Sequence, residues 1–497
     1  MNINQAKNEI KNTVQAYLAK DASGFYKIPS IRQRPILLMG PPGIGKTQIM
    51  EQIARECRIG LVAYTITHHT RQSAVGLPFI REEQFEGKAY SVTEYTMSEI
   101  IASVYRKREE SGQKEGILFI DEINCVSETL APTMLQFLQC KTFGNQAIPE
   151  GWIIVAAGNP PEYNKSVRDF DMVTLDRVRY LEIEAEYSVW KRYARENHLH
   201  PAILSYLDLR PKNFYRVEAD VDGLQFVTAR GWEDLSNLMY VYEELGLLID
   251  ETIVHEFLHH SDAAEDAAAY FDLYRKYRDD YGIAEILCGK EKPEVYARID
   301  AAAFDERLSV VNLLLDGLQT KFANVAKERA VTDDWYLFLR EYRQRLDETE
   351  DGAACYDALL SEAEARVWEE RDAGFSTREE TARREVLLKL WRENSPQSGC
   401  AKEESFQTAS QGFGKQRESL EERERAAAAA LECAFDFMEK AFAHGQEMVV
   451  FVTELAIRAE AAAFLAEHTC ARYLQYNEQL LVGKRKAELL SELTQGM

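Results

Sequence analysis

One short segment near the start of the chain constrains its fold more than any other: Gly40-Pro41-Pro42-Gly43-Ile44-Gly45-Lys46-Thr47. It follows a short apolar run, 35–39, which predicts a buried strand, and it precedes a segment whose apolar residues have helical spacing. Glycines in such a turn let successive backbone N–H groups, together with the positive end of the helix, point at an anion. The pattern therefore predicts a loop that binds the phosphates of a nucleoside triphosphate.

The residues of this loop have distinct expected roles. Lys46 can reach the β- and γ-phosphates, and the Thr47 hydroxyl can bind Mg²⁺. ATP is expected rather than GTP, because the chain has no Asn-Lys-x-Asp motif for reading a guanine base; the segment 164–167 lacks the Asp. The full set of expected nucleotide-binding residues is Gly40, Pro41, Pro42, Gly43, Ile44, Gly45, Lys46, Thr47 and Gln48.

A second segment, Gly116-Ile117-Leu118-Phe119-Ile120-Asp121-Glu122, predicts another buried strand with two carboxylates at its end. Four consecutive apolar residues are typical of a parallel sheet that is covered on both faces. Ligands of open α/β sheets bind at the carboxyl ends of the strands. We therefore expect Asp121 to hold the Mg²⁺ shell and Glu122 to orient and polarise the attacking water.

Two further segments extend this pattern. The apolar run 152–157 predicts a strand at whose end Asn159 would hydrogen-bond the γ-phosphate or the attacking water. Beyond it, Leu175-Asp176-Arg177-Val178-Arg179-Tyr180 leads into an expected strand at 180–183. The section 68–88, which contains Gly76, Pro78 and Gly87, is expected to be irregular.

Composition narrows the class of protein. A chain of 497 residues is expected to form two to four domains. Its formal net charge of −23 disfavours a general attraction to nucleic acid or to anionic lipid. The eight cysteines include no Cys-x-x-Cys pair, which suits reduced thiols. With no signal-peptide pattern and no apolar run long enough for a bilayer, a cytoplasmic protein without a membrane partner is expected.

The ordered set of phosphate loop, Asp-Glu strand, Ala-Ala-Gly-Asn-Pro and Leu-Asp-Arg resembles the AAA+ ATPases, and most closely their MoxR-like branch. The resemblance covers about residues 30–280. It implies an α/β fold with a P-loop parallel-sheet core, followed by an all-α lid and a C-terminal helical region. The corresponding divisions are 1–185 with an N-terminal helix, 186–281, and 282–497 with a possible linker near 395–415.

The resemblance also implies roles for particular residues. Asn159 corresponds to sensor 1, and Arg177 to an arginine finger that is presented to a neighbouring subunit, with Arg179 as a second candidate. Arg230, in Thr228-Ala229-Arg230-Gly231, corresponds to the start of the sensor-2 helix and would contact the γ-phosphate of its own subunit. A finger that acts in trans requires a ring, expected to be a hexamer. The implied client is a protein, with a partner that carries a von Willebrand factor A domain.

Other readings stay open at this stage. His255-Glu256-Phe257-Leu258-His259 has the spacing of a zinc hydrolase, and Asp262 or Glu265 are available as a third ligand. The location of this segment in the expected lid favours instead a helix with exposed histidines and a surface-exposed His260. A binding module that switches on nucleotide but turns over slowly is a further alternative. The C-terminal helices fit equally a self-contained bundle or an arm that docks a partner.

Overall fold

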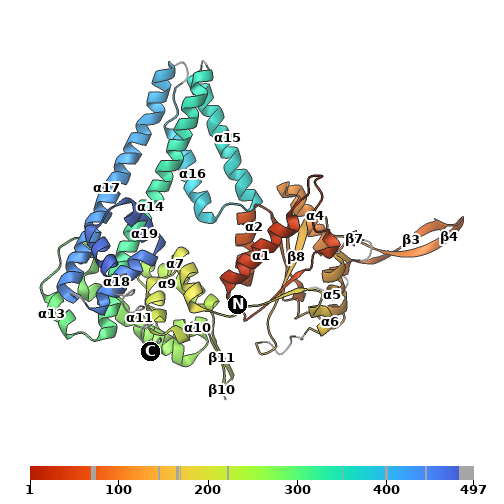
Figure 1. Cartoon of the computed structure of the whole chain (residues 1–497), viewed down its shortest axis with the longest axis horizontal. Helices are drawn as coiled ribbons and strands as arrows, with labels where there is room; N and C mark the ends of the chain where they lie inside the picture. Colours follow the sequence, from red (N-terminus) through yellow and green to blue (C-terminus); the bar gives the residue numbers. More distant parts are fainter. Residues whose placement is uncertain are drawn as a thin grey trace, which may run out of the picture.

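The computed structural model describes residues 1–68, 74–143, 146–163, 167, 170–220, 223–349, 351–397, 401–442 and 445–480 (Figure 1). Residues 164–166, where the base-reading motif was sought, lie outside this set. A five-stranded sheet with the order β2-β5-β8-β1-β9 organises the N-terminal part. All four pairings are parallel, which confirms the predicted α/β core. The strands are β1 (Ile36–Met39), β2 (Gly60–Thr65), β5 (Gly116–Asp121), β8 (Trp152–Gly158) and β9 (Arg179–Glu182).

Helices cover both faces of this sheet, as the continuous apolar strands predict. Successive side chains of a strand point to opposite faces, so Leu38 and Phe119 pack on one side while Leu37 and Leu118 pack on the other. The first face is covered by α1 (Ile3–Leu18) and α2 (Lys46–Cys57), and the second by α4 (Glu99–Ser111) and α5 (Ala131–Cys140). The sheet edge where the strands end is therefore held rigidly between two packed layers.

A hairpin projects from this core and corrects the expectation of irregular structure at 68–88. Strands β3 (Pro78–Phe85) and β4 (Lys88–Tyr95) pair antiparallel and extend away from the sheet (Figure 1). Glu86 and Gly87 join them, both with positive φ (51° and 78°), as a two-residue turn of the primed type requires. The glycine that indicated a break in structure instead closes a hairpin. Residues 69–73 of this section lie outside the described set.

The region that follows the sheet is mainly helical, as expected for a lid, but it contains a two-stranded hairpin. Its helices are α7 (Tyr187–Glu196), α8 (Pro201–Leu209), α9 (Ala229–Leu245), α10 (Glu251–Leu258) and α11 (Ser261–Tyr281). Strands β10 (Arg216–Asp220) and β11 (Gly223–Val227) pair between α8 and α9. Trp232 and Leu235 of α9 are fully buried in the core of this region, as the apolar spacing predicts.

The C-terminal region is built around two long helices, α14 (Phe304–Glu348) and α17 (Lys402–Phe442), which lie side by side (Figure 1). The first half of α14 and the second half of α17 share one apolar core with the lid. The second half of α14 and the first half of α17 form a second core with α15 (Gly352–Ala373) and α16 (Arg378–Glu393). The remaining helices are α12 (Ile283–Ile286), α13 (Glu294–Ala301), α18 (Gln446–Ile457) and α19 (Ala459–Glu467).

The position of α17 corrects the linker expected near 395–415, because the chain is helical from Lys402 onward. Gly412, which favoured a flexible segment, serves packing: a Cβ there would lie 2.2 Å from the Asn394 side-chain oxygen. Among the described helices, none is both long and apolar enough to cross a membrane.

Candidate functional site

The predicted phosphate loop lies between the end of β1 and the start of α2. Gly43 and Gly45 have φ values of 74° and 90°, a left-handed conformation in which a side chain would be strained. Gly45 is the N-cap of α2, so the first turn of that helix opens directly onto the loop. The loop therefore presents free backbone N–H groups and a helix N-terminus to the same space, as an anion site requires.

Lys46 is buried, and its ammonium is bound on three sides. It donates to the carbonyl oxygens of Gly40 and Pro41 and to the side-chain oxygen of Asn159, each at 2.8 Å. Burial lowers the pKa of Lys46 to about 8; Asp121 and Glu122 oppose this effect, and Arg230 adds to it. The mutual influence of these groups shows that the loop, the two carboxylates and Arg230 share one electrostatic environment.

The carboxylates at the end of β5 have separate partners. The Thr47 hydroxyl donates to Oδ2 of Asp121 at 3.0 Å, and the backbone N–H of Glu122 donates to Oδ1 of Asp121 at 2.9 Å. Glu122 has a positive φ of 57°, which turns it out of the strand direction. Its Oε2 accepts a hydrogen bond of 2.9 Å from the Thr67 hydroxyl. Glu122 is thus oriented by a side chain that follows the neighbouring strand β2.

Asn159 is fixed by Asn124, which is buried. The Asn124 side chain donates to the carbonyl of Asn159 at 2.8 Å and accepts from its backbone N–H at 3.3 Å. Sequence analysis missed both Asn124 and Thr67. No local sequence pattern marks Thr67, because it lies beside Glu122 only through the β2–β5 register, in which Thr65 pairs with Asp121.

Thr47 and Asp121 suit the Mg²⁺ that the sequence implies. Both present oxygen donors, which are 3.0 Å apart and border the same cavity as the loop. Mg²⁺ prefers oxygen ligands and is commonly held by one or two protein groups, with phosphates and water completing its shell.

Most of the predicted residues of the site line this cavity, which measures about 160 Å³. The predicted residues outside its lining are Gly40, Pro41, Ile44 and Arg177. Arg230 begins α9 at its border, and its backbone N–H donates to the carbonyl of Gly43 at 3.2 Å. Glu233, which sequence analysis missed, accepts from Tyr193 at 3.0 Å and from Gln48 at 3.4 Å. The cavity is lined by Pro42, Gly43, Gly45, Lys46, Thr47, Gln48, Asp121, Glu122, Asn159, Arg230 and Glu233.

A larger cavity of about 480 Å³ adjoins the first and shares Gly43, Gly45, Gln48 and Glu233 with it. Its other walls are the start of α1 and the helices α2, α7 and α9. Trp190 and Tyr193 of α7 contribute aromatic surface, and the first residues of the chain contribute amide groups. A pocket with aromatic walls and a few polar groups, open to a phosphate loop, has the properties of a nucleoside site.

The two arginines considered as fingers differ in their surroundings. Arg179 binds α1 of its own chain, where it donates to the Thr13 hydroxyl at 2.6 Å and pairs with Glu9. Arg177 is exposed beyond the short helix α6 (Met172–Leu175), and it donates to Gln139 at 2.5 Å. Arg177 does not line the cavity of its own chain. Arg177 is therefore the more exposed of the two arginines, and among the described residues its side chain hydrogen-bonds only Gln139.

The histidine segment does not assemble a metal site in the described structure. His255 and Glu256 are exposed on α10, which ends at Leu258, and His259 follows as its C-cap with a φ of 23°. The two imidazoles therefore do not share a regular helix face. The expectation of an exposed His260 was wrong: this residue is 3% exposed, with its Nε2 at 3.5 Å from a Glu218 oxygen.

The fold and the site together define a P-loop nucleotide-binding protein, with a parallel sheet whose strand ends carry the phosphate loop, an Asp-Glu pair and an asparagine. Residues 36–173 match the family model described as ATPase family associated with various cellular activities (AAA). The matched region contains β1, the loop, Asp121, Glu122 and Asn159, and it supports an AAA+ ATPase. No curated protein shows significant sequence similarity to the chain.

Proposed function

We propose that this protein is a Mg²⁺-dependent AAA+ ATPase of MoxR type that assembles into a ring and remodels a protein partner. The observation that carries the proposal is the meeting of Lys46, Asp121, Glu122 and Asn159 around one cavity. These residues come from three separate parts of the chain. Each has the chemistry that phosphoryl transfer to water needs: a cation, a metal-binding oxygen, a base and an amide.

The chain's own groups account for binding and for orientation of water. The loop N–H groups and Lys46 bind the β- and γ-phosphates, with Arg230 at the γ-phosphate side. Glu122, oriented by Thr67, accepts a hydrogen bond from the attacking water and takes its proton as the bond from water to the γ-phosphorus forms. The bond between that phosphorus and the β–γ bridging oxygen breaks in the same displacement, so ADP leaves and inorganic phosphate is formed. Asn159, held by Asn124, orients the same water or the γ-phosphate. Thr47 and Asp121 would hold the Mg²⁺, which would supply positive charge to the phosphate oxygens.

The larger cavity supports a nucleoside triphosphate as the ligand, since it lies next to the loop and offers Trp190 and Tyr193 to a base. The exposed position of Arg177 supports a ring, expected to be a hexamer, because its guanidinium lies outside its own site. A protein client and a partner with a von Willebrand factor A domain follow from the MoxR-like resemblance. A cytoplasmic location completes the proposal and suits the seven cysteines of the described chain, which are all free thiols.

The test compares the wild type with Glu122→Gln. The amide of Gln fits the same space as the carboxylate but cannot act as a base. This variant should therefore bind ATP with near wild-type affinity. It should hydrolyse ATP at least about 100-fold more slowly, because a general base typically contributes a factor of this size to the rate. Glu110→Gln, an exposed change in the last turn of α4, is the matched control and should retain full turnover. Proteins that co-purify with Glu122→Gln, and not with the control, would identify the client.

Wild-type turnover by Glu122→Gln would contradict the role of Glu122. Tight binding of ATP by the wild type with negligible hydrolysis, in assembled as well as unassembled samples, would point instead to a nucleotide-switched binding module.

A further inference from the structure

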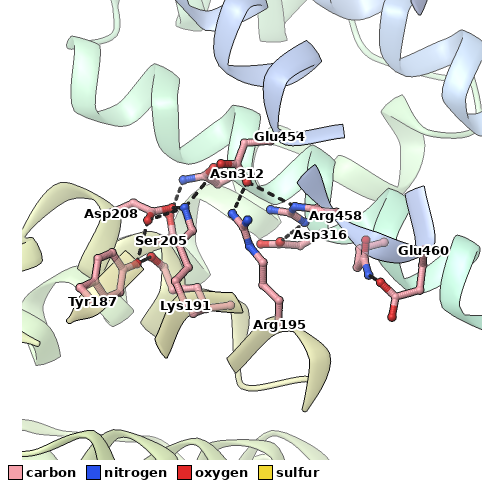
Figure 2. A network of polar contacts seen from close by, with 12 residues as sticks. Tyr187, Lys191, Arg195, Ser205, Asp208, Asn312, Asp316, Glu454, Arg458 and Glu460 are labelled. Carbon is pink, nitrogen blue, oxygen red and sulfur yellow. Dashed lines mark hydrogen bonds and ion pairs between the residues drawn. The ribbon is translucent and has the colours of Figure 1, made fainter. Parts of the chain in front are cut away.

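Helix α7 presents two different faces to two different parts of the molecule. Trp190 and Tyr193 lie on the wall of the nucleoside cavity. Lys191 and Arg195 are offset from them by about 100° or more around the helix and do not line that cavity. Both point instead toward Glu454 (Figure 2). A displacement of α7 toward or away from the C-terminal helices would therefore move one wall of the nucleotide site.

Glu454 of α18 holds the outer face of α7. Its carboxylate pairs with Arg195 and lies 3.4 Å from the Lys191 ammonium (Figure 2). All three side chains are shielded, with exposed fractions of 14% for Glu454, 16% for Arg195 and 17% for Lys191. Glu454 is about 260 positions away from Lys191 and Arg195 in the chain, so only the tertiary fold brings it to them.

The same carboxylate is tied to the long helix α14. Arg458, at the junction of α18 and α19, lies 3.6 Å from Glu454 and 2.8 Å from Asp316 of α14. Asp316 also accepts a hydrogen bond of 2.6 Å from the Tyr274 hydroxyl. Glu454 is therefore the negative centre between three cations, two of which belong to α7 and one to the C-terminal helices.

The balance of charge makes this centre sensitive to substitution. Burial disfavours the Glu454 carboxylate, yet Lys191, Arg195 and Arg458 together keep its pKa below the ordinary value. Removal of one partner from a buried ion pair leaves the remaining charges uncompensated, which is more disruptive than loss of an exposed pair. Without the Glu454 charge, Lys191 would keep its ion pair with Asp208 and Arg458 its ion pair with Asp316. Arg195 would lose its carboxylate partner, and α7 would lose its ionic contacts with α18.

The inner face of α7 is linked in turn to the phosphate-loop helix. Tyr193 donates to Glu233 of α9, and Gln48 of α2 donates to the same carboxylate. A continuous series of polar contacts thus runs from Gln48 through α7 to Glu454 and α14. Such a series shows physical contiguity; a coupling energy between its ends has to be measured.

We propose that Glu454 is a positioning residue for the nucleotide site: it fixes the α7 wall of the nucleoside cavity and makes nucleotide affinity depend on the packing of α18. This inference rests on the proposed function of that site. Because coupling between two sites is reciprocal, a bound nucleotide would in turn strengthen the packing of α18 against α7.

The experiment measures the Kd of ADP and of inorganic tripolyphosphate, and the ATPase parameters, for Glu454→Gln. We expect the Kd of ADP and the KM for ATP to rise about tenfold, which corresponds to about 1.4 kcal/mol. The α7 wall binds the nucleoside equally in the ground and transition states, so kcat should stay within about twofold. Tripolyphosphate, which lacks a nucleoside, should bind as to the wild type.

Two variants accompany it. Glu454→Asp keeps the charge and should recover most of the affinity for ADP. The matched control is Glu362→Gln, which removes the carboxylate of an exposed ion pair with Arg345 at the far end of the helical region, and should leave every constant unchanged. Should Glu454→Gln fail to fold, Arg195→Gln gives the same test, since it leaves Glu454 paired with Lys191 and Arg458.

An unchanged Kd for ADP in a folded Glu454→Gln variant would overturn the positioning role. An equal loss of affinity for ADP and for tripolyphosphate would overturn it too. Failure of the wild type to bind ADP at all would instead overturn the proposed function, so the two failures are distinguishable.

Discussion

The Lys46 ammonium lies 2.8 Å from the side-chain oxygen of Asn159, although 113 residues separate them in the chain. The parallel pairing of β1 with β8, which sets Met39 opposite Gly158, ends both strands at the same level. The next residues of each segment therefore meet at one edge of the sheet. The Lys46 ammonium and the Asn159 amide are thus positioned by the same backbone register.

Replacement of Lys46 with alanine should abolish tight nucleotide binding, because it removes the buried cation that faces the phosphates. We expect the Kd for ATP to rise by at least 100-fold, measured by calorimetry, since charge-assisted contacts to phosphate contribute several kcal/mol in a shielded site. Lys114→Ala, an exposed change before β5, is the control. Retention of wild-type affinity by Lys46→Ala would contradict the phosphate-loop assignment.

Replacement of Arg177 with alanine should leave ATP binding almost normal and slow hydrolysis by about 10³-fold, the contribution of a finger in related phosphoryl transfers. Mixing Arg177→Ala with Lys46→Ala is the sharper measurement. The first variant supplies an intact pocket without a finger, and the second a finger without a pocket. Some interfaces in a mixed ring would be complete, so part of the activity should return.

The matched control for this experiment is Arg179→Ala, which loses only contacts with Glu9 and Thr13 of its own chain. It should hydrolyse ATP at close to the wild-type rate. Absence of any recovery in the mixture, in samples shown by sizing to have exchanged subunits, would count against a finger at Arg177. A loss of activity in Arg179→Ala that the Lys46 variant restores would transfer the role to Arg179.

Simultaneous replacement of His255 and His259 with alanine should leave ATPase activity within a few-fold of the wild type. Both side chains are exposed, and the described residues around them form no group of three metal-binding side chains. Metal analysis of the purified native protein provides the independent measurement. One zinc per chain in the native protein, lost in the double variant, would revive the zinc-hydrolase reading.

Lys141 predicts a pH-dependent contribution to stability. It is 7% exposed, and burial lowers its pKa from 10.5 to about 8. Its ammonium donates to the side-chain oxygen of Gln33 at 3.1 Å. Burial is the physical cause of the lowered pKa. Between about pH 8 and 10.5 the unfolded chain keeps this proton while the native state loses it, so the Lys141 contribution to stability rises with pH.

The measurement is the free energy of unfolding of the wild type and of Lys141→Met at pH 7 and pH 10. The difference should move in favour of the wild type by about 2.5 kcal/mol over this interval, because nearly two of its pH units lie between the folded and unfolded pKa values and each corresponds to about 1.36 kcal/mol. Taking the difference removes the contribution of other groups that titrate in the same range, such as Lys46. A difference that is independent of pH would show that Lys141 is charged equally in both states.

Local sequence is enough to place the main groups of the candidate site. The position of the predicted phosphate loop, of Asp121 and Glu122, and of Asn159 can be read from the sequence, because each follows a run of apolar residues that is typical of a buried strand. A parallel sheet brings such strand ends to one edge whatever the order of the strands. The patterns therefore specified the main groups of the site without any knowledge of the register.

Tertiary structure decided everything that depends on contacts between distant segments. Thr67 reaches Glu122 only because β2 pairs with β5, and Arg179 is engaged by α1, which covers the sheet beside it. Nothing near Glu454 in the sequence indicates that it lies between Lys191 and Arg195. The physical reason is that a short sequence pattern predicts only whether a residue is buried or exposed. The partner of its side chain depends on how whole helices and strands pack against one another.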